Sequence, residues 1–143
     1  MAEIDAKAYL MQVERYDNMI GLKIEEMDRL RALTTKITAS WKQDVVSASG
    51  SQDKLGDAIA KIVDLQTEIN DAIDTYVDRK REVSSIIEKI ENQNQFAVLS
   101  KKYLLYESLE QIAVEMHMSY RNVCYIHGEA LLAVNELLKK SFH

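Results

Sequence analysis

The sequence of 143 residues contains no proline, four glycines and a single cysteine. Proline breaks helix interiors and glycine weakens them, so their scarcity favours long helices. A lone Cys124 excludes an internal disulfide and fits a reducing cytoplasm. The N-terminal MAEIDAKAYL is acidic, and no window has eighteen apolar residues, so we expect neither a signal peptide nor a membrane span. These absences predict a cytoplasmic, all-α protein.

Charge is unevenly distributed along the chain. Hydrophobic residues make up 47% and charged residues 29% of the chain. The hydrophobic fraction provides enough apolar surface for a core, so we expect a folded protein and not a disordered one. The net charge of −5 weighs against non-specific binding of nucleic acid. Residues 96–143 carry five basic and five acidic residues, so the whole excess lies in residues 1–95. The C-terminal segment is therefore neutral.

Two long segments have the helical spacing of apolar residues, with steps of three and four. The first is expected from about Asp5 to Val46, with an apolar seam of Leu10, Val13, Tyr16, Ile20, Ile24, Met27, Leu30, Leu33 (or Thr34), Ile37 and Trp41. The polar SASGSQDK around Gly50 predicts a turn, with Ser51 or Asp53 as the next helix cap. The second helix is expected over Gln52 to Glu91, with a seam of Leu55, Ile59, Ile62, Leu65, Ile69, Ile73, Tyr76, Val83, Ile87 and Ile90.

Two helices of about forty residues joined by a short turn must run antiparallel. We therefore predict a coiled-coil hairpin over residues 1–94, with polar NQNQ at 92–95 marking its boundary. A two-helix hairpin buries little surface per residue, so a second copy or a partner protein is expected to cover the remainder. Residues 95–143 form the predicted second domain, which starts with a helix around Phe96 to Tyr106.

The stretch SLEQIAVEMHMSYRNVCYIHGEALLAV, residues 108–134, has the spacing of a helix-turn-helix. Apolar residues occupy the positions where the helices cross, and Ala113 is the small residue at their close approach. Ser119 is a good N-cap for a second helix starting at Tyr120. The turn position, often glycine, is His117, a residue type enriched at positive φ. The apolar positions are Ile112, Met116, Met118, Val123 and Ile126. An ordinary amphipathic helix pair can show the same spacing.

If the second helix enters a major groove, its N-terminal side chains face base edges. Arg121 is suited to guanine and Asn122 to adenine or a phosphate, while Tyr120 and Tyr125 suit phosphates or thymine methyls. The predicted DNA-binding set is Ser119, Tyr120, Arg121, Asn122, Cys124, Tyr125, Lys101 and Lys102, with Lys139 and Lys140 as further candidate phosphate contacts. The alternative interpretation is a mildly polar surface helix with solvated lysines, in which Cys124 is only a small residue at the helix edge.

No catalytic or metal site is indicated. Cys124 and His127 share a helix face and His117 is near in sequence, but zinc normally takes four ligands and no second pair exists. His127 is expected to be partly buried. Gly50 and Gly56 lack the Gly-Lys-Ser/Thr of a phosphate loop. We predict a protein that is not an enzyme and has no cofactor.

The run VLSKKYLLYESLEQIAVEMHMSYRNVCYIHGEALLAVNELL resembles region 4 of the bacterial sigma-70 family. That resemblance implies promoter DNA and RNA polymerase as partners. The positions that match its pattern are Val98, Leu99, Tyr103, Leu104, Ser108, Leu109, Ile112, Ala113, Ser119, Val123, Ala130 and Leu131. Region 4 is usually basic where this chain has Cys124, Tyr125 and Glu129. An isolated monomer is therefore expected to bind a promoter weakly.

The whole chain resembles small proteins encoded by phages and prophages of Gram-positive bacteria, through YLMQVERYDNMIGLKIEEMDRLR and SQDKLGDAIAKIVDLQTEINDAIDTYVDRKREV. This resemblance implies a late-gene transcriptional regulator in the cytoplasm of a bacterial host. We expect it to bind double-stranded DNA as a homo-oligomer through its hairpin, or with RNA polymerase, and not to contact membranes. The alternative is a helical interaction module without DNA affinity. Because counterion release makes DNA binding salt-sensitive, salt dependence separates the two.

Overall fold

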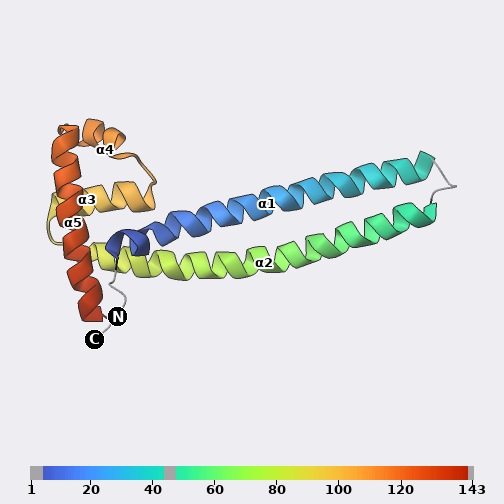
Figure 1. The fold of residues 1–143 in the computed structure, drawn as a ribbon, viewed down its shortest axis with the longest axis horizontal. Coiled ribbons are helices and arrows are strands. Elements are labelled where there is room, and N and C mark those ends of the chain that lie inside the picture. Colours follow the sequence, from blue (N-terminus) through green and yellow to red (C-terminus); the bar gives the residue numbers. More distant parts are fainter. Residues whose placement is uncertain (1–4, 44–47, 142–143) are drawn as a thin grey trace. The chain divides into compact units, whose positions relative to one another are not determined.

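A computed structural model describes residues 5–43 and 48–141, and within these ranges every regular element is helical (Figure 1). The elements are α1 (Ala6–Gln43), α2 (Ala48–Glu88), α3 (Gln93–Leu99), a π-helical turn η2 (Ser100–Leu104), α4 (Leu109–Met116) and α5 (Tyr120–Ser141). Helices α1 and α2 pack together as an antiparallel hairpin, and smaller helices follow. The predicted all-α class and the predicted order of hairpin and small helices are confirmed.

The start of the second long helix was predicted wrongly. Helix α2 begins at Ala48, so Gly50 lies inside it, and so do Ser51 and Asp53, the predicted caps. Glycine lowers helix stability by about 1 kcal/mol but keeps its backbone N–H, so a helix of 41 residues continues through it. The predicted end of the first helix at Val46 falls outside the described residues. Asn92 accepts a hydrogen bond from the Gln95 backbone N–H and caps α3, so the NQNQ stretch does mark a helix boundary.

The chain forms two compact units, residues 17–75 and residues 1–16 with 76–143. In the first, Met27 of α1 is buried against Leu65 and Ile69 of α2, and Leu30 and Ile62 pack beside them. A salt bridge of 3.0 Å joins Lys23 Nζ to Glu68 Oε2. The predicted seam is partly wrong, because four of its members are 40% or more exposed: Ile24, Leu33, Ile59 and Ile73.

The second unit contains the candidate site. Its core combines the first turns of α1 and the end of α2 with α3, η2 and α5. The buried members are Ala6, Leu10, Val13, Val83, Ile86, Ile87, Ile90, Leu99, Tyr103, Ala130, Val134 and Leu138. Asn135 of α5 accepts a hydrogen bond of 3.0 Å from the backbone N–H of Ala6. The C-terminal half of α5 is therefore fixed on the hairpin ends.

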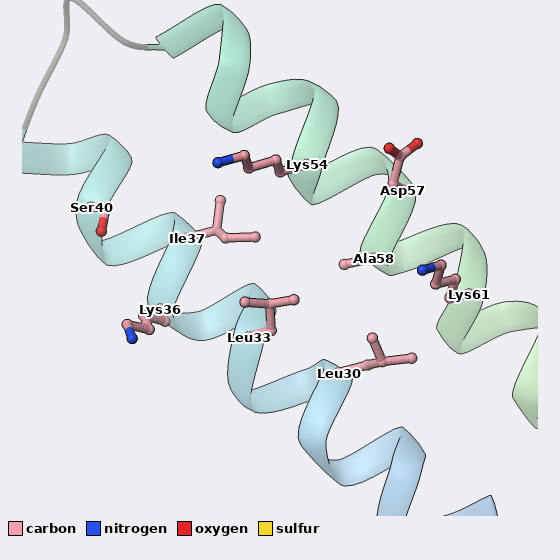
Figure 2. Close-up of a pocket in the computed structure, with 9 residues that line it drawn as sticks. All are labelled: Leu30, Leu33, Lys36, Ile37, Ser40, Lys54, Asp57, Ala58 and Lys61. Atoms are coloured by element: carbon pink, nitrogen blue, oxygen red, sulfur yellow. The ribbon is translucent and has the colours of Figure 1, made fainter.

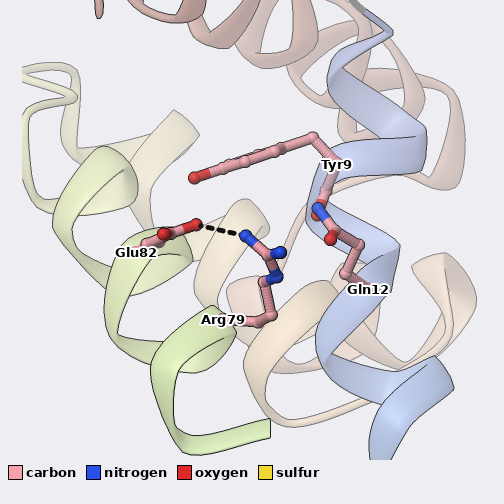
Figure 3. Close-up of polar contacts among 4 residues, drawn as sticks. All are labelled: Tyr9, Gln12, Arg79 and Glu82. Carbon is pink, nitrogen blue, oxygen red and sulfur yellow. Dashed lines mark hydrogen bonds and ion pairs between the residues drawn. The ribbon is translucent and has the colours of Figure 1, made fainter. Parts of the chain in front are cut away.

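This unit also has polar contacts within α1 and within α2. Arg79 Nη1 lies 3.2 Å from Glu82 Oε2, and the Gln12 amide donates to the carbonyl oxygen of Tyr9 (Figure 3). Burial raises the pKa of the Tyr9 phenol, the charge of Glu82 adds to this, and Arg79 opposes it. The predicted domains, a helical hairpin over residues 1–94 and a helix-turn-helix domain over residues 95–143, stay a prediction. No helix in the described ranges is long and apolar enough to cross a bilayer.

Candidate nucleic-acid interface

Helices α4 and α5 cross over a small core of their own. Val98 of α3, Ile112 and Ala113 of α4, and Val123 of α5 are all buried there. Around them pack Leu109, Met116, Met118 and Ile126. Every position predicted from the helix-turn-helix spacing contributes to this cluster. The core therefore fixes the angle at which the first turns of α5 leave the domain.

The turn between α4 and α5 has the backbone geometry that the sequence predicted. His117 has φ 57° and ψ 42°, in the left-handed region. The Met118 N–H donates to the Ala113 carbonyl at 3.0 Å, and the His117 N–H donates to the Val114 carbonyl at 3.3 Å. These two bonds form a Schellman motif, and Ala113 and Met118 both belong to the small core beside it.

Both helices of the motif have serine caps. Ser108 Oγ accepts from the Gln111 N–H, and Ser119 Oγ accepts from the Asn122 N–H, each at 3.1 Å. Helix α5 starts at Tyr120, as predicted. Because the Ser119 cap bonds a backbone N–H of the first turn, α5 begins at one defined residue. The start of the helix in turn determines which side chains point outward.

The leading helix differs from its prediction over Phe96 to Tyr106. It consists of α3 followed by η2, where the Leu105 N–H donates to the Ser100 carbonyl at 3.1 Å. The helix ends at Leu104, and Tyr106 has a φ of 60°. In a π-turn each hydrogen bond spans one residue more than in an α-helix, and sequence periodicity gives no signal for it.

The predicted DNA-reading side chains lie at the start of α5. Tyr120, Arg121, Asn122 and Tyr125 are exposed, and Cys124 is half-buried. The Cys124 thiol hydrogen-bonds to Tyr120 and raises the pKa of its phenol. The exposed Tyr120 hydroxyl is of a kind that can donate to a phosphate oxygen. Four of the predicted DNA-contacting residues, all except the half-buried Cys124 in this group, are therefore accessible at the start of α5.

The predicted lysines are less free. Lys101 Nζ lies 2.9 Å from Glu115 Oε2 on α4, and this hydrogen bond raises the lysine pKa. The pKa of Glu115 is lowered by hydrogen bonds to Glu107 and Lys101, whereas that of Glu107 is raised, first by its hydrogen bond to Glu115. Lys102 Nζ lies 5.8 Å from the centre of the Tyr103 ring. The cluster of Lys101, Glu107 and Glu115 was not predicted from the sequence. Its members come from η2, from the segment that follows it and from α4.

At the far end of α5, Lys139 and Lys140 are exposed in the last turn. Lys139 Nζ lies 3.6 Å from Glu136 Oε1. Exposed pairs of this kind are worth little, so both lysines are available to solvent or to a phosphate.

The inner face of α5 holds a partly buried polar contact. Tyr103 Oη lies 2.7 Å from His127 Nε2, and the two rings stack with centroids 5.7 Å apart. Burial, with a smaller effect of Asp5, raises the pKa of Tyr103 to about 12. Burial lowers the pKa of His127, and the charges of Lys102 and Lys7 lower it further. His127 is thus a partly buried helix residue, as predicted, and connects α5 to η2.

The sequence profile of a family described as "Protein of unknown function (DUF1492)" matches residues 36–135. This range is more than half of the chain, so the chain belongs to that family. No curated protein and no solved structure matches the chain. The matched range includes α2, α3, α4 and most of α5, and with them the whole helix-turn-helix.

Proposed function

We propose that this DUF1492 protein is a transcriptional regulator of phage or prophage genes that reads double-stranded DNA with the first turns of α5. The proposal is carried by one observation, the built start of that helix. A Schellman turn at His117 and the Ser119 cap fix where α5 begins. Arg121, Asn122 and the flanking tyrosines are exposed beyond them.

An α-helix fits the major groove, where each base pair presents a distinct pattern of donors and acceptors. Arg121 donates two hydrogen bonds, one to the O6 and one to the N7 of a guanine. Asn122 pairs in the same way with the N6 and N7 of an adenine. Tyr120 and Tyr125 donate to flanking phosphates, and the positive end of the helix dipole favours the same anions.

The lack of net positive charge in the domain determines how it acts. Its five basic residues are matched by five acidic ones, and Lys101 is held by Glu115. Few phosphates are neutralised, so the affinity of one copy is low. Either two copies on neighbouring half-sites add their binding energies, or RNA polymerase holds the domain at a promoter. The resemblance to sigma-70 region 4 supports the second arrangement, because RNA polymerase holds sigma factors at promoters.

The test is a pair of arginine variants titrated against a labelled duplex from the gene neighbourhood of this protein. Arg121→Ala removes the proposed guanine contact and is expected to weaken binding by about 1–3 kcal/mol, which is roughly 5- to 150-fold. Arg29→Ala removes the same charge from an exposed position of α1 and should leave affinity within twofold. Equal affinities for both folded variants would remove Arg121 from the proposed site.

A helical interaction module without DNA affinity is the second candidate, and one observation favours it. Val114 on α4 is 75% exposed and Leu105, after η2, is 64% exposed. Large apolar side chains on the surface are typical of protein contacts when they gather in patches. A contact of this kind depends little on salt, whereas DNA binding weakens steeply as salt rises.

A further inference from the structure

Helix α2 carries an uncharged stripe beside the face that packs on α1, in the unit of residues 17–75. Its members are Ile59, Val63, Gln66, Asn70 and Ile73, all exposed to solvent. Each of them comes one position after a residue that faces α1. These inward-facing residues are Ala58, Ile62, Leu65, Ile69 and Ala72. One helical step is about 100°, so the stripe lies at roughly a right angle to the face that packs on α1.

The opposite flank of α2 is charged. Lys54, Lys61 and Glu68 are spaced by seven residues and share one side of the helix. Glu68 is bridged to Lys23 of α1 on this side. Figure 2 shows Lys54 and Lys61 on the rim of a groove of about 420 Å³ between α1 and α2. The contrast between the two flanks marks the uncharged stripe as the surface that lacks a partner in one chain.

The stripe is self-complementary when a copy of itself runs antiparallel. Val63 and Ile73 lie at equal distances on either side of position 68, and so do Gln66 and Asn70. A two-fold axis at that level brings Val63 against Ile73 of the second copy, and Gln66 against Asn70. Within one chain the Gln66 amide already donates to Asn70 Oδ1 at 3.0 Å. The sequence also has valine at 77, the position that this axis pairs with Ile59.

Helix α1 fits the same axis independently. The Lys23–Glu68 bridge sets residue 23 of α1 level with residue 68 of α2. Ile24 is one helical step from Lys23, toward the flank that carries the stripe, and is 40% exposed. The axis at position 68 therefore brings Ile24 close to Ile24 of the second copy.

We propose that a second copy of this chain docks antiparallel on the α2 stripe, so that residues 17–75 of two chains form a four-helix bundle. A right angle between the two packed faces of α2 is the corner geometry of such a bundle, and antiparallel pairing keeps both α1 helices on the same side of the α2 pair. Gln66 and Asn70 at the centre set the register, as single polar residues do in coiled coils. This inference deepens the proposed function by naming the partner of the hairpin, but it does not depend on DNA binding.

Disulfide trapping tests the pairing in the full chain without DNA. In a Cys124→Ser background, Ile24→Cys is expected to form covalent dimers by itself in a glutathione redox buffer. Val63→Cys and Ile73→Cys should cross-link efficiently only when mixed, and intact mass identifies the product as the heterodimer. Leu22→Cys, 66% exposed and two positions from Ile24, is the matched control and should give only background cross-linking.

A second pair of variants measures the strength of the contact by analytical ultracentrifugation. Val63→Glu introduces a charge twice in the two-fold interface, so the dimer dissociation constant should rise at least tenfold. Leu22→Glu should leave it within twofold. The proposal is overturned if the unsubstituted chain sediments as a monomer at tens of micromolar. It is also overturned if Val63→Cys pairs with itself and not with Ile73→Cys, because that pattern indicates a parallel dimer.

Discussion

Replacing His117 with glycine should stabilise the protein, because the turn between α4 and α5 requires a conformation that disfavours a Cβ. His117 has φ 57° and ψ 42°, and its side chain is exposed. The bonds that form the turn use only backbone atoms of His117 and Met118. His117→Gly therefore removes the steric cost and leaves those bonds in place.

The magnitude follows from two opposing terms. A left-handed conformation costs an L-residue about 1–2 kcal/mol, and glycine avoids that cost. Glycine in turn loses more backbone entropy on folding, by roughly 0.5–1 kcal/mol. The net expectation is a gain of about 0.5–1 kcal/mol in the free energy of unfolding, or roughly 2–4 °C in Tm for a chain of this length.

Urea unfolding followed by circular dichroism, at one fixed protein concentration, measures the gain. His117→Ala keeps a Cβ at positive φ and should give none. Tyr106→Gly relieves the same conformation at φ 60°, but Tyr106 packs against the main core, so roughly 2 kcal/mol or more of packing is lost and the variant should be less stable. Equal stabilities for His117→Gly and His117→Ala would refute the reasoning.

Three further predictions concern the cap, the partly buried histidine and the proposed dimer. Ser119→Ala should lower the free energy of unfolding by about 1 kcal/mol in the same urea assay, since it leaves an N-terminal amide of α5 without its acceptor; no loss would mean that water caps the helix equally well. The lowered pKa of His127 means that the unfolded chain binds the extra proton first, so this contribution to stability is complete above about pH 6.5 and is lost as pH falls toward the folded pKa. His127→Gln should therefore flatten stability between pH 7.5 and 5.5 relative to wild type, and an unchanged slope would contradict this. Gln66→Leu combined with Asn70→Leu should tighten the dimer but allow Val63→Cys to pair with itself; preserved orientation would show that the amides do not set the register.

Local signals in the sequence predicted the helix-turn-helix well. Its determinants lie within a few residues of one another: a residue type that tolerates positive φ at position 117, a serine cap at 119 and an apolar core at fixed spacing. Each has a strong backbone or packing effect on its immediate neighbours. The start of α5 could therefore be assigned to the residue.

Features that depend on distant segments were missed. The cluster of small and polar residues around Gly50 predicted a turn, but a long helix gains most of its stability from packing and continues through them. Ile24, Ile59 and Ile73 were assigned to the seam by spacing alone, but a wide apolar face serves two neighbours and periodicity does not say which. The Tyr103–His127 contact and the Lys101–Glu115 bridge join separate helices and have no sequence signal.

The most direct test of the central claim is a fluorescence-anisotropy titration of the full chain against duplex from its own gene neighbourhood, over a series of salt concentrations. A scrambled duplex of the same length is the control, and RNA polymerase is added in a parallel series. The account predicts preference for the native duplex and a log–log salt slope of about −0.9 for each phosphate contacted, with few contacts in total. Equal affinity for both duplexes, or no binding at low salt with or without polymerase, would contradict it.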